Sequence, residues 1–388
     1  MNPKRLVKTV FIVSVLSSMS AIAAPSITPD PPVLGAKGYI LMDYNTGQVL
    51  VEHNAHDRLN PASLTKLMTA YVAGQEVSAG NINLDDQVTI SRKAWAKNFP
   101  DSSKMFIEVG TSVSMMDLYR GLVVQSGNDA SVAIAEHVAG SEDAFVSLMN
   151  SWADKLNLNN TAYTNPHGLD SDGLYSTPYD IALLSQGIIR DLPTIYPLYS
   201  ELDFEYNGIT QYNRNGLLRD RSLNVDGMKT GYTSGAGYSL ATSATSGEMR
   251  LISVVMGSKS VRSRESESKQ LLSYGFRFFD TVSAGEAGKE IAKARLWMGE
   301  QDEVSVGVLD DVFITLPKSE SGKVKAELVY DGDLVAPIQS DQVVGTVIYS
   351  IGDKDVASAD LVALQPVEEG GFVKRIFDWL KRLVTSWF

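Results

Sequence analysis

A serine and a lysine three positions apart are the first residues in this chain whose types and spacing could do chemistry. They form Ser63-Leu64-Thr65-Lys66, directly after Asn60-Pro61-Ala62 at the start of a predicted helix. Residues three apart on a helix share a face, so the hydroxyl and the amine can meet and the lysine can act as the base for a serine nucleophile. The tetrapeptide alone is weak evidence, because Ser266-Glu267-Ser268-Lys269 repeats the pattern.

Two further polar motifs follow along the chain. Ser126-Gly127-Asn128 lies between two predicted helices, where a glycine-containing loop can turn a hydroxyl and an amide toward a cleft. Lys229-Thr230-Gly231 lies on a predicted strand. The second motif also recurs, as Ser222-Leu223-Asn224. A catalytic site is therefore indicated by the three motifs together, in this order, on a helix start, an interhelical loop and a strand.

The histidines offer alternatives that the sequence argues against. His53-Asn54-Ala55-His56 lacks the glutamate of zinc-protease patterns and is typical of a polar turn after a strand. His167 precedes Gly168-Leu169-Asp170, which indicates a loop anchor rather than a catalytic group. The chain has no Gly-x-Ser-x-Gly elbow for Ser-His-Asp chemistry. We therefore expect no metal and no cofactor, and we expect Lys66 to be the base for Ser63.

The elements around Ser63 predict how it is held. Residues 38–44 and 48–52 flank Asn45-Thr46-Gly47, a composition typical of a turn between antiparallel strands. Pro61 marks the start of the next helix. One side of that helix is apolar at intervals of three and four, which predicts that it packs on a core and fixes the orientation of its first turn. The apolar residues are Leu64, Leu67, Met68, Tyr71 and Val72.

The later elements alternate between helix and strand. Ser114 begins a capping-box pattern that predicts a helix to about Val124, and residues 130–138 predict a third helix. From Asn224 the apolar period changes to two. The predicted strands are 225–233, 238–245 and 250–257. Helical spacing returns at 265–279. Because the earlier helices are enclosed between N-terminal strands and later strands, the order of elements predicts one mixed sheet with a helical lobe at its side.

Beyond residue 280 the sequence predicts a separate, small all-β module. Turns such as Asp331-Gly332-Asp333 separate its short strands. The predicted strands are 294–297, 312–316, 324–330, 346–349 and 360–364. The module contains no candidate nucleophile or ligand cluster, so we expect a spacer or recognition role for it.

The last segment, 372–388, follows Gly370-Gly371 and has a strongly amphipathic pattern. Apolar side chains that include two tryptophans fill one half of a helical wheel, and four basic side chains lie on the other half. This pattern favours attachment to an anionic membrane surface, with packing on the protein itself or self-association as the alternatives. The segment is too short and too charged to span a bilayer.

The first 24 residues have the order of a secretory signal: basic residues, an apolar run at 10–16 and Ala21-Ile22-Ala23-Ala24. Cleavage would remove three basic and no acidic residues and move the formal net charge from −12 to −15. A body this acidic argues against nucleic-acid binding. The chain has no cysteine, so no disulfide supports the fold. We expect an exported protein, and the lack of cysteine fits a periplasm without deciding the compartment.

The three motifs together resemble those of the penicillin-binding serine D,D-peptidases, which are identified by Ser-x-x-Lys, Ser-x-Asn and Lys-Thr-Gly. More narrowly, the chain is similar over essentially its whole length to the low-molecular-mass D-alanyl-D-alanine carboxypeptidases of the penicillin-binding protein five and six group. The matching stretches are 60–69, 126–130, 167–170 and 224–231.

That resemblance implies an α+β fold. A β-lactamase-like mixed α/β domain of the transpeptidase type would be followed by a small all-β domain and an amphipathic helix. The implied divisions are a signal peptide at 1–24, the D,D-peptidase domain at 25–280, the β-rich domain at 281–366 and the membrane-anchor helix at 367–388.

The residues of the first two motifs have separable roles. Ser63 must lose its proton as it attacks an acyl carbon, and Lys66 can accept that proton only when neutral. We expect enclosure in the cleft and the like charge of Lys229 to lower the pKa of Lys66. Ser126 can pass the proton to the leaving amine, and Asn128 can bond the substrate's amide.

The third motif is suited to binding the end of a peptide. Lys229 and Thr230 can bind a terminal carboxylate, and Gly231 lets the substrate lie against the strand as an added edge. The resemblance implies an oxyanion hole from the backbone N–H groups of Ser63 and Tyr232. Many relatives have histidine after Lys-Thr-Gly, so Tyr232 is a departure that bears on deacylation or pH dependence. The resemblance also implies two helpers near the carboxylate, for which surface salt bridges are an equal explanation: Arg214 and Arg264.

The expected function is removal of the terminal D-Ala from peptidoglycan pentapeptides through an acyl-enzyme, with β-lactams acylating the same Ser63. The alternatives within the fold are a D,D-endopeptidase and a β-lactamase, for which we find no Glu-x-x-Leu-Asn-like element between Ser126 and Lys229. A third alternative is a β-lactam sensor or wall-binding protein without turnover.

Overall fold

The computed structural model of the chain describes residues 12–13 and 28–385. Apart from Ile12–Val13, the predicted signal segment lies outside the described residues. The described residues divide into two compact units, one of residues 29–277 and one that contains residues 12–13, 28 and 278–385. The motif residues all lie in the first unit.

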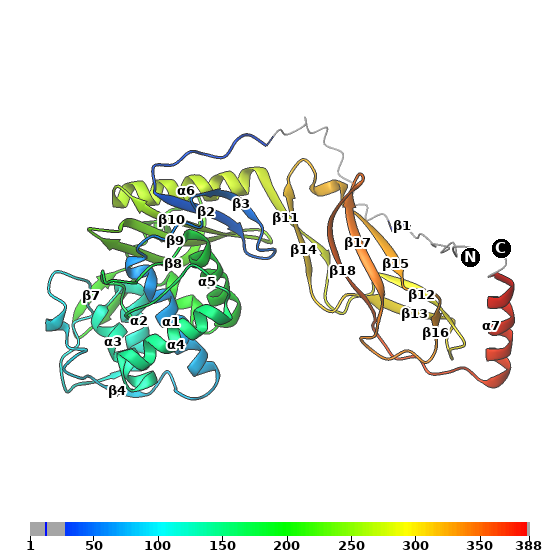
Figure 1. The fold of residues 1–388 in the computed structure, drawn as a ribbon, viewed down its shortest axis with the longest axis horizontal. Helices are drawn as coiled ribbons and strands as arrows, with labels where there is room; N and C mark the ends of the chain where they lie inside the picture. The colour runs from blue at the N-terminus through cyan, green and yellow to red at the C-terminus, as the bar shows by residue number, and fades with distance from the viewer. Residues whose placement is uncertain (1–11, 14–27, 386–388) are drawn as a thin grey trace. The chain divides into compact units, whose positions relative to one another are not determined.

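The first unit is built on a five-stranded sheet (Figure 1). Its strand order is β3-β2-β10-β9-β8. The strands are β2 (Gly38–Asp43), β3 (Val49–His53), β8 (Asn224–Thr233), β9 (Gly237–Ser246) and β10 (Met249–Ser258). The predicted N-terminal hairpin and the three predicted later strands are thereby confirmed.

The prediction of a mixed sheet is wrong, because every neighbouring pair of strands in this sheet is antiparallel. The N-terminal hairpin and the β8-β9-β10 meander join through β2 and β10, with Val254 opposite Ile40. An alternating apolar pattern shows which side chains are buried but not which way a distant strand runs, so the sequence could not give this direction.

Helices cover both faces of the sheet. Helix α6 (Val261–Phe278) lies along one face, and α5 (Pro178–Asp191) lies on the other with the helical lobe beyond it (Figure 1). Helix α6 begins four residues before the predicted start at residue 265 and turns Leu271 and Leu272 into the protein. Two further two-stranded antiparallel sheets pair β4 (Gln87–Thr89) with β5 (Ser112–Ser114), and β6 (Asp203–Tyr206) with β7 (Ile209–Tyr212).

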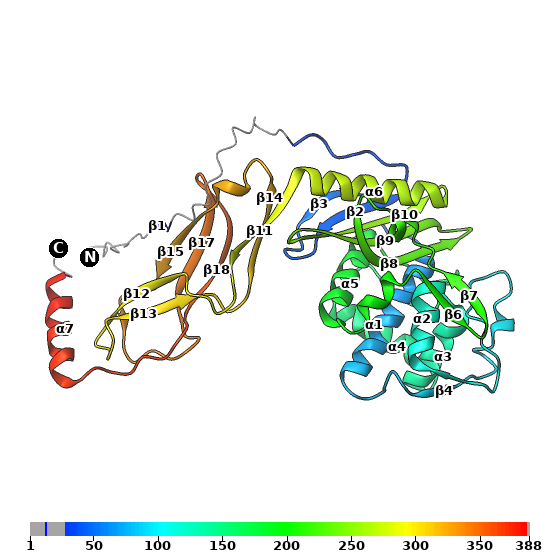
Figure 2. The same cartoon turned by 180° about the vertical axis from the view of Figure 1, so that it is seen from behind.

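The helical lobe contains α1 to α4 (Figure 2). These helices are α1 (Thr65–Ser78), α2 (Met115–Arg120), α3 (Asn128–Ala139) and α4 (Glu142–Lys155). Ser114 caps α2 as predicted, because its hydroxyl accepts from the N–H of Asp117 at 3.1 Å. The predicted continuation to Val124 is a π-helical segment, Gly121–Gln125, which changes the direction in which the next loop leaves the helix.

The second unit is rich in β-structure, as predicted. Its larger sheet has the order β1-β15-β17-β18-β13-β12-β16, and β11 pairs with β14. The strands are β1 (Ile12–Val13), β11 (Phe279–Gly285), β12 (Ala292–Trp297), β13 (Glu303–Gly307), β14 (Val312–Pro317), β15 (Lys325–Tyr330), β16 (Leu334–Val335), β17 (Val343–Ile351) and β18 (Lys354–Ala363). We did not predict β1, β11, β13 or β16 as strands. Each is short or lacks a long apolar alternation.

The chain ends in helix α7 (Phe372–Thr385), within the predicted amphipathic segment. Among the described residues, no helix combines the length and the apolar character needed to cross a bilayer.

Candidate active site

Ser63 lies in a 3₁₀ turn, Ala62–Leu64, that leads directly into α1. The carbonyl of Pro61 accepts from the N–H of Leu64 at 3.0 Å, and the Asn60 side chain accepts from the N–H of Ala62 at 2.9 Å. These bonds fix the turn that precedes the helix. The Ser63 side chain lines a cavity of about 960 Å³.

Lys66 lies in the first turn of α1, and its Nζ donates to Ser63 Oγ at 3.1 Å. The same Nζ donates to Asn128 Oδ1 at 2.6 Å and to the carbonyl of His167 at 2.5 Å. Lys66 is only 1% exposed. The spacing in the sequence therefore brings the hydroxyl and the amine into direct contact.

Burial, followed by the positive charge of Arg214, lowers the pKa of Lys66 to about 7, while the carboxylate of Asp129 opposes the shift. Enclosure is thus the main cause, as the sequence predicted. The like charge that we expected from Lys229 is supplied chiefly by Arg214. A lysine with this pKa is neutral in a large fraction of molecules near neutral pH, which a general base requires.

Ser126 follows the π-helical segment in a left-handed conformation, with φ of 66°. The residue is buried but its side chain lines the cavity, and its hydroxyl forms no hydrogen bond with another described residue. The hydroxyl is thus available to a bound substrate. Asn128, two residues on, also donates from its Nδ2 to Ser102 Oγ at 2.9 Å, so both ends of its amide are already bonded.

The strand β8 carries Lys229, Thr230 and Gly231 past the Ser63 turn. A Cβ at Gly231 would lie 3.0 Å from the carbonyl oxygen of Pro61, so a larger residue at this position would push against the Ser63 turn. Lys229 is 2% exposed, and its Nζ donates only to the carbonyl of Thr230 at 3.2 Å. Burial, followed by the charge of Lys66, lowers the pKa of Lys229 well below its ordinary value.

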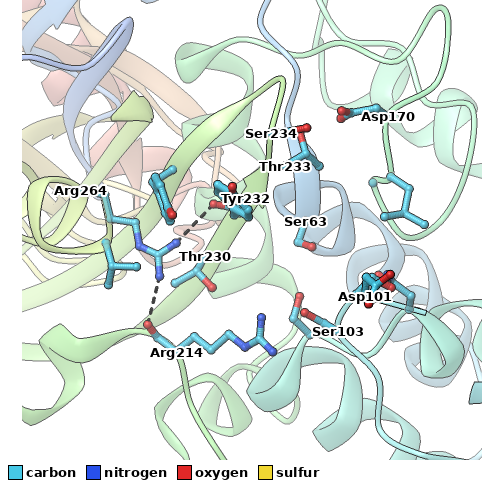
Figure 3. A pocket seen from close by; sticks show the side chains of 18 residues that line it. Ser63, Asp101, Ser103, Asp170, Arg214, Thr230, Tyr232, Thr233, Ser234 and Arg264 are labelled. Carbon is cyan, nitrogen blue, oxygen red and sulfur yellow. Dashed lines mark hydrogen bonds between the residues drawn. The ribbon is translucent and has the colours of Figure 1, made fainter. Parts of the chain in front are cut away.

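Arg214 and Arg264 lie together at one wall of the cavity (Figure 3). Arg264 is 4% exposed and donates only to backbone carbonyls, those of Gly231, Ser239 and Arg214, at 3.3 to 3.5 Å. Its Nε has no hydrogen-bond partner among the described residues. Burial lowers the pKa of Arg264 to about 10 and also lowers that of Arg214.

Neither arginine forms an ion pair with a carboxylate in the described part of the chain, so the alternative of surface salt bridges is wrong for both. Among the described residues, the two arginines of the cavity wall thus have no carboxylate within ion-pair distance, although the charge of Glu265 acts on Arg264 from farther away. Such a wall is suited to an anionic group of a ligand.

The cavity brings the predicted residues together. Ser63, Ser126, Asn128, Thr230, Gly231, Tyr232, Arg214 and Arg264 line it, while Lys66 and Lys229 lie buried behind. Tyr232 is at the rim, 52% exposed, with its ring stacked on that of Tyr238 at 4.3 Å between centroids. Figure 3 shows Ser63 between the arginine wall and the side that carries Asp101 and Ser103.

The comparisons with known proteins identify the family of the unit that carries this site. The family model described as D-alanyl-D-alanine carboxypeptidase matches residues 26–260. The chain belongs to this family. The C-terminal domain of penicillin-binding protein 5 matches residues 279–369 of this D-alanyl-D-alanine carboxypeptidase.

Relatives match it over nearly their whole length. The D-alanyl-D-alanine carboxypeptidase DacA of Escherichia coli K12 is 49% identical over 94% of this chain and 91% of its own. The DacA protein of Haemophilus influenzae is 48% identical over 99% of each chain. The crystal structure of penicillin-binding protein 5 from Haemophilus influenzae superposes with a TM-score of 0.82 and 50% identity, over 88% of this chain and all of that one.

The carboxypeptidase site also depends on residues that the motifs do not name. The carbonyl of His167 accepts from Lys66, while its ring Nδ1 accepts from the N–H of Leu169 at 3.1 Å. Burial, followed by the charge of Lys66, lowers the pKa of His167 to about 3, so the ring is neutral. The next residue, Gly168, has φ of 84°, and a Cβ there would lie 1.9 Å from the carbonyl oxygen of Ala62. His167 is thus a loop anchor, as its sequence context predicted.

Proposed function

We propose that this D-alanyl-D-alanine carboxypeptidase removes the terminal D-Ala of peptidoglycan pentapeptides through an acyl-enzyme on Ser63. The observation that carries the proposal is the contact between Lys66 Nζ and Ser63 Oγ, 3.1 Å, at a lysine whose pKa burial lowers to about 7. Neutral Lys66 accepts the hydroxyl proton while Ser63 Oγ bonds to the carbonyl carbon of the penultimate D-Ala.

The carbon–nitrogen bond to the terminal D-Ala then breaks, and the leaving nitrogen takes a proton. We assign its delivery to Ser126, because its hydroxyl lines the cavity and is not bonded to another described residue. Asn128 orients Lys66 and faces the substrate's amide from the same wall. Water then hydrolyses the ester on Ser63 and restores the enzyme.

The terminal carboxylate of the substrate binds at the cationic wall. Lys229 and Arg264 supply two buried basic groups there, Arg214 supplies an exposed one, and Thr230 supplies a hydroxyl. Because Lys229 and Arg264 are buried and form no ion pair with a carboxylate among the described residues, a ligand carboxylate meets basic groups that are already removed from water. This preorganisation favours peptides that end in a free carboxylate.

The oxyanion that forms on the attacked carbonyl is assigned to the backbone N–H groups of Ser63 and Tyr232. Both residues line the cavity, and β8 is the edge strand of its sheet, so one side of its backbone is available to a substrate strand. β-Lactams present a carbonyl and a carboxylate to the same groups, and we assign their acylation to Ser63. A Listeria monocytogenes penicillin-binding protein D2 of the same fold, 29% identical, was solved with ampicillin bound.

The enzymatic proposal is tested by D-Ala release from diacetyl-Lys-D-Ala-D-Ala. We expect the wild-type protein to release D-Ala and to retain penicillin as a slowly hydrolysed adduct. Rapid nitrocefin turnover would indicate a β-lactamase instead, and cleavage of crosslinked but not of linear muropeptides would indicate a D,D-endopeptidase. Binding of penicillin without any release of D-Ala would leave only a sensor or wall-binding role.

Helix α7 is proposed to attach the protein to a membrane surface. Its polar face is held by its own β-rich unit: Asp378 accepts from the N–H of Met298 at 2.9 Å, and Lys374 pairs with Asp302 at 2.9 Å. Arg375 and Arg382 also pair with carboxylates of that unit. The exposed apolar residues on the helix are Phe372, Val373, Ile376, Phe377, Trp379, Leu380 and Leu383. Because basic residues are engaged internally, we assign attachment chiefly to insertion of the apolar face.

Deleting the chain from Gly371 onward is expected to move the protein from the membrane pellet to the supernatant with D-Ala release unchanged. The double variant Phe377→Glu, Trp379→Glu tests the apolar face without deleting the helix, because it alters two exposed side chains and leaves Asp378 in place. Sedimentation with vesicles measures both. Retention of the truncated protein in the pellet would contradict the assignment.

With this anchor we propose the division of the chain into a signal peptide at 1–24, a peptidase domain at 25–280, a β-rich domain at 281–366 and the helix at 367–388. The protein would then act at the periplasmic face of the inner membrane.

A further inference from the structure

We propose that Asp129 is a positioning residue of the carboxypeptidase reaction, which holds Asn128 and the segment 101–107 in the arrangement that orients Lys66. The inference rests on the proposed role of Lys66 as base. Asp129 itself does not line the cavity.

Among the residues that the structure describes, the carboxylate of Asp129 accepts only from backbone N–H groups. Its Oδ1 accepts from Met105 at 2.8 Å and from Ala130 at 2.9 Å, and its Oδ2 accepts from Phe106 at 2.9 Å and from Ile107 at 3.3 Å. The residue is fully buried and has no ion pair in the described part of the chain. Burial raises its pKa while the four N–H donors lower it. One buried carboxylate thus ties three consecutive residues of a loop to the start of α3.

The tied loop bonds directly to Asn128. The carbonyl of Ser103 accepts from the backbone N–H of Asn128 at 2.9 Å, and Ser102 Oγ accepts from its Nδ2 at 2.9 Å. The other end of the same amide, Oδ1, accepts from Lys66 Nζ. The loop, the amide and the amine therefore form one continuous chain of hydrogen bonds, and Ser102 and Ser103 also line the cavity.

Segment 101–107 needs contacts from other parts of the protein to keep its backbone conformation. Phe106 has φ of 70° and Asp101 has φ of 53°, a left-handed conformation that costs free energy for residues other than glycine. Outside contacts such as those of Asp129, and the Gln211 Nε2 bond to the carbonyl of Lys104 at 3.1 Å, retain this conformation. Without the carboxylate, the three N–H groups of residues 105–107 lose their acceptor, and we expect the loop to move away from Asn128.

Asp129 also acts on Lys66 through its charge. The charged or titratable groups that interact with Lys66 are Asp129, Arg214, Lys229 and His167. Asp129 is the one that raises the pKa of Lys66, whereas Arg214 lowers it. Loss of the negative charge would therefore lower the pKa of Lys66 further and let it deprotonate at a lower pH.

Two variants of the full-length protein distinguish the effect of Asp129 on the position of the loop from the effect of its charge on Lys66. Asp129→Asn keeps the size but loses the charge and one acceptor oxygen, and Asp129→Glu keeps the charge but displaces both oxygens. Penicillin titration gives the fraction of acylable sites, and the acylation rate per site is then measured against pH. We expect both variants to acylate about tenfold to a hundredfold more slowly per site. Only Asp129→Asn should move the rising limb of the pH profile to lower pH.

A purely structural role would reduce the acylable fraction while leaving the rate per site and the pH limb unchanged, and this outcome would overturn the proposal. If Asp129→Asn does not fold, the proposal is tested with Asp129→Glu and Ser102→Ala. Ser102→Ala removes the hydroxyl that accepts a hydrogen bond from Asn128 Nδ2, and it should slow acylation about twofold to tenfold. Wild-type rates in both of these variants would also overturn the proposal.

Discussion

Replacing Ser63 with alanine is expected to abolish both D-Ala release and covalent labelling by penicillin. The hydroxyl is the atom that Lys66 contacts, and it is the proposed bond-forming atom in the cavity. Removal of a serine nucleophile lowers kcat by at least about 10⁴-fold even when the binding groups remain. Release is measured as free D-Ala, and labelling is measured with a fluorescent penicillin.

The chain supplies a matched control for this variant. Ser266 occupies the equivalent position of the second Ser-x-x-Lys tetrapeptide, but it is exposed on α6. Ser266→Ala should retain wild-type release and labelling. Release of D-Ala by Ser63→Ala at a rate near that of the wild type would contradict the assignment of the nucleophile.

Removing the base at position 66 should cost nearly as much. Lys66→Met and Lys66→Arg are both expected to slow acylation by about 10²- to 10⁴-fold, because general-base catalysis contributes an effect of this size. Arginine keeps the positive charge but stays protonated at any relevant pH, so it cannot accept the proton. Lys269→Arg, in the second tetrapeptide, is the control and should leave the rate unchanged. Rapid acylation by Lys66→Arg would exclude Lys66 as the base.

The same lysine predicts the pH dependence of the wild-type enzyme. The pKa of Lys66 lies at about 7, below its ordinary value, so the amine is neutral above this pH and protonated below it. The acylation rate should therefore rise through pH 7 and level off above it. Stopped-flow acylation by a chromogenic β-lactam measures this profile. A rate that begins to rise only near the ordinary lysine pKa would contradict the burial argument.

Much of the site could be predicted from sequence because its residues lie on elements with strong local signals. Pro61 and the apolar spacing after it place Ser63 and Lys66 at a helix start, and the alternation after Asn224 places Lys229 on a strand. The order of the three motifs, together with their contexts, was enough to indicate one cleft.

Other parts of the site depend on contacts that no local pattern encodes. The carbonyl of His167 reaches Lys66 from a residue 101 positions away, and a backbone carbonyl has no sequence signature. The π-helical segment before Ser126 is a small change in helical hydrogen bonding that a capping pattern does not predict. Asp129 could have been noticed as an acidic residue in a predicted helix start, but its loop partners are more than twenty residues away.

The fold shows the same division between local and distant information. The N-terminal hairpin and helices α1, α3 and α6 followed from periodicity, whereas we did not predict α4 or α5. The direction of β2 against β10 depended on how distant segments meet. The amphipathic pattern of α7 was evident, but the internal partners of its basic side chains, Asp302, Glu369 and Asp333, were not.

The most direct test is to locate the acyl group during turnover. Wild-type enzyme is mixed with a D-Ala-D-Ala peptide, quenched rapidly and digested, and the peptide that contains Ser63 is analysed by mass spectrometry while free D-Ala is assayed in the same sample. We expect the acyl part of the substrate on Ser63 together with release of D-Ala. Release of D-Ala with the acyl group on another residue would contradict the account.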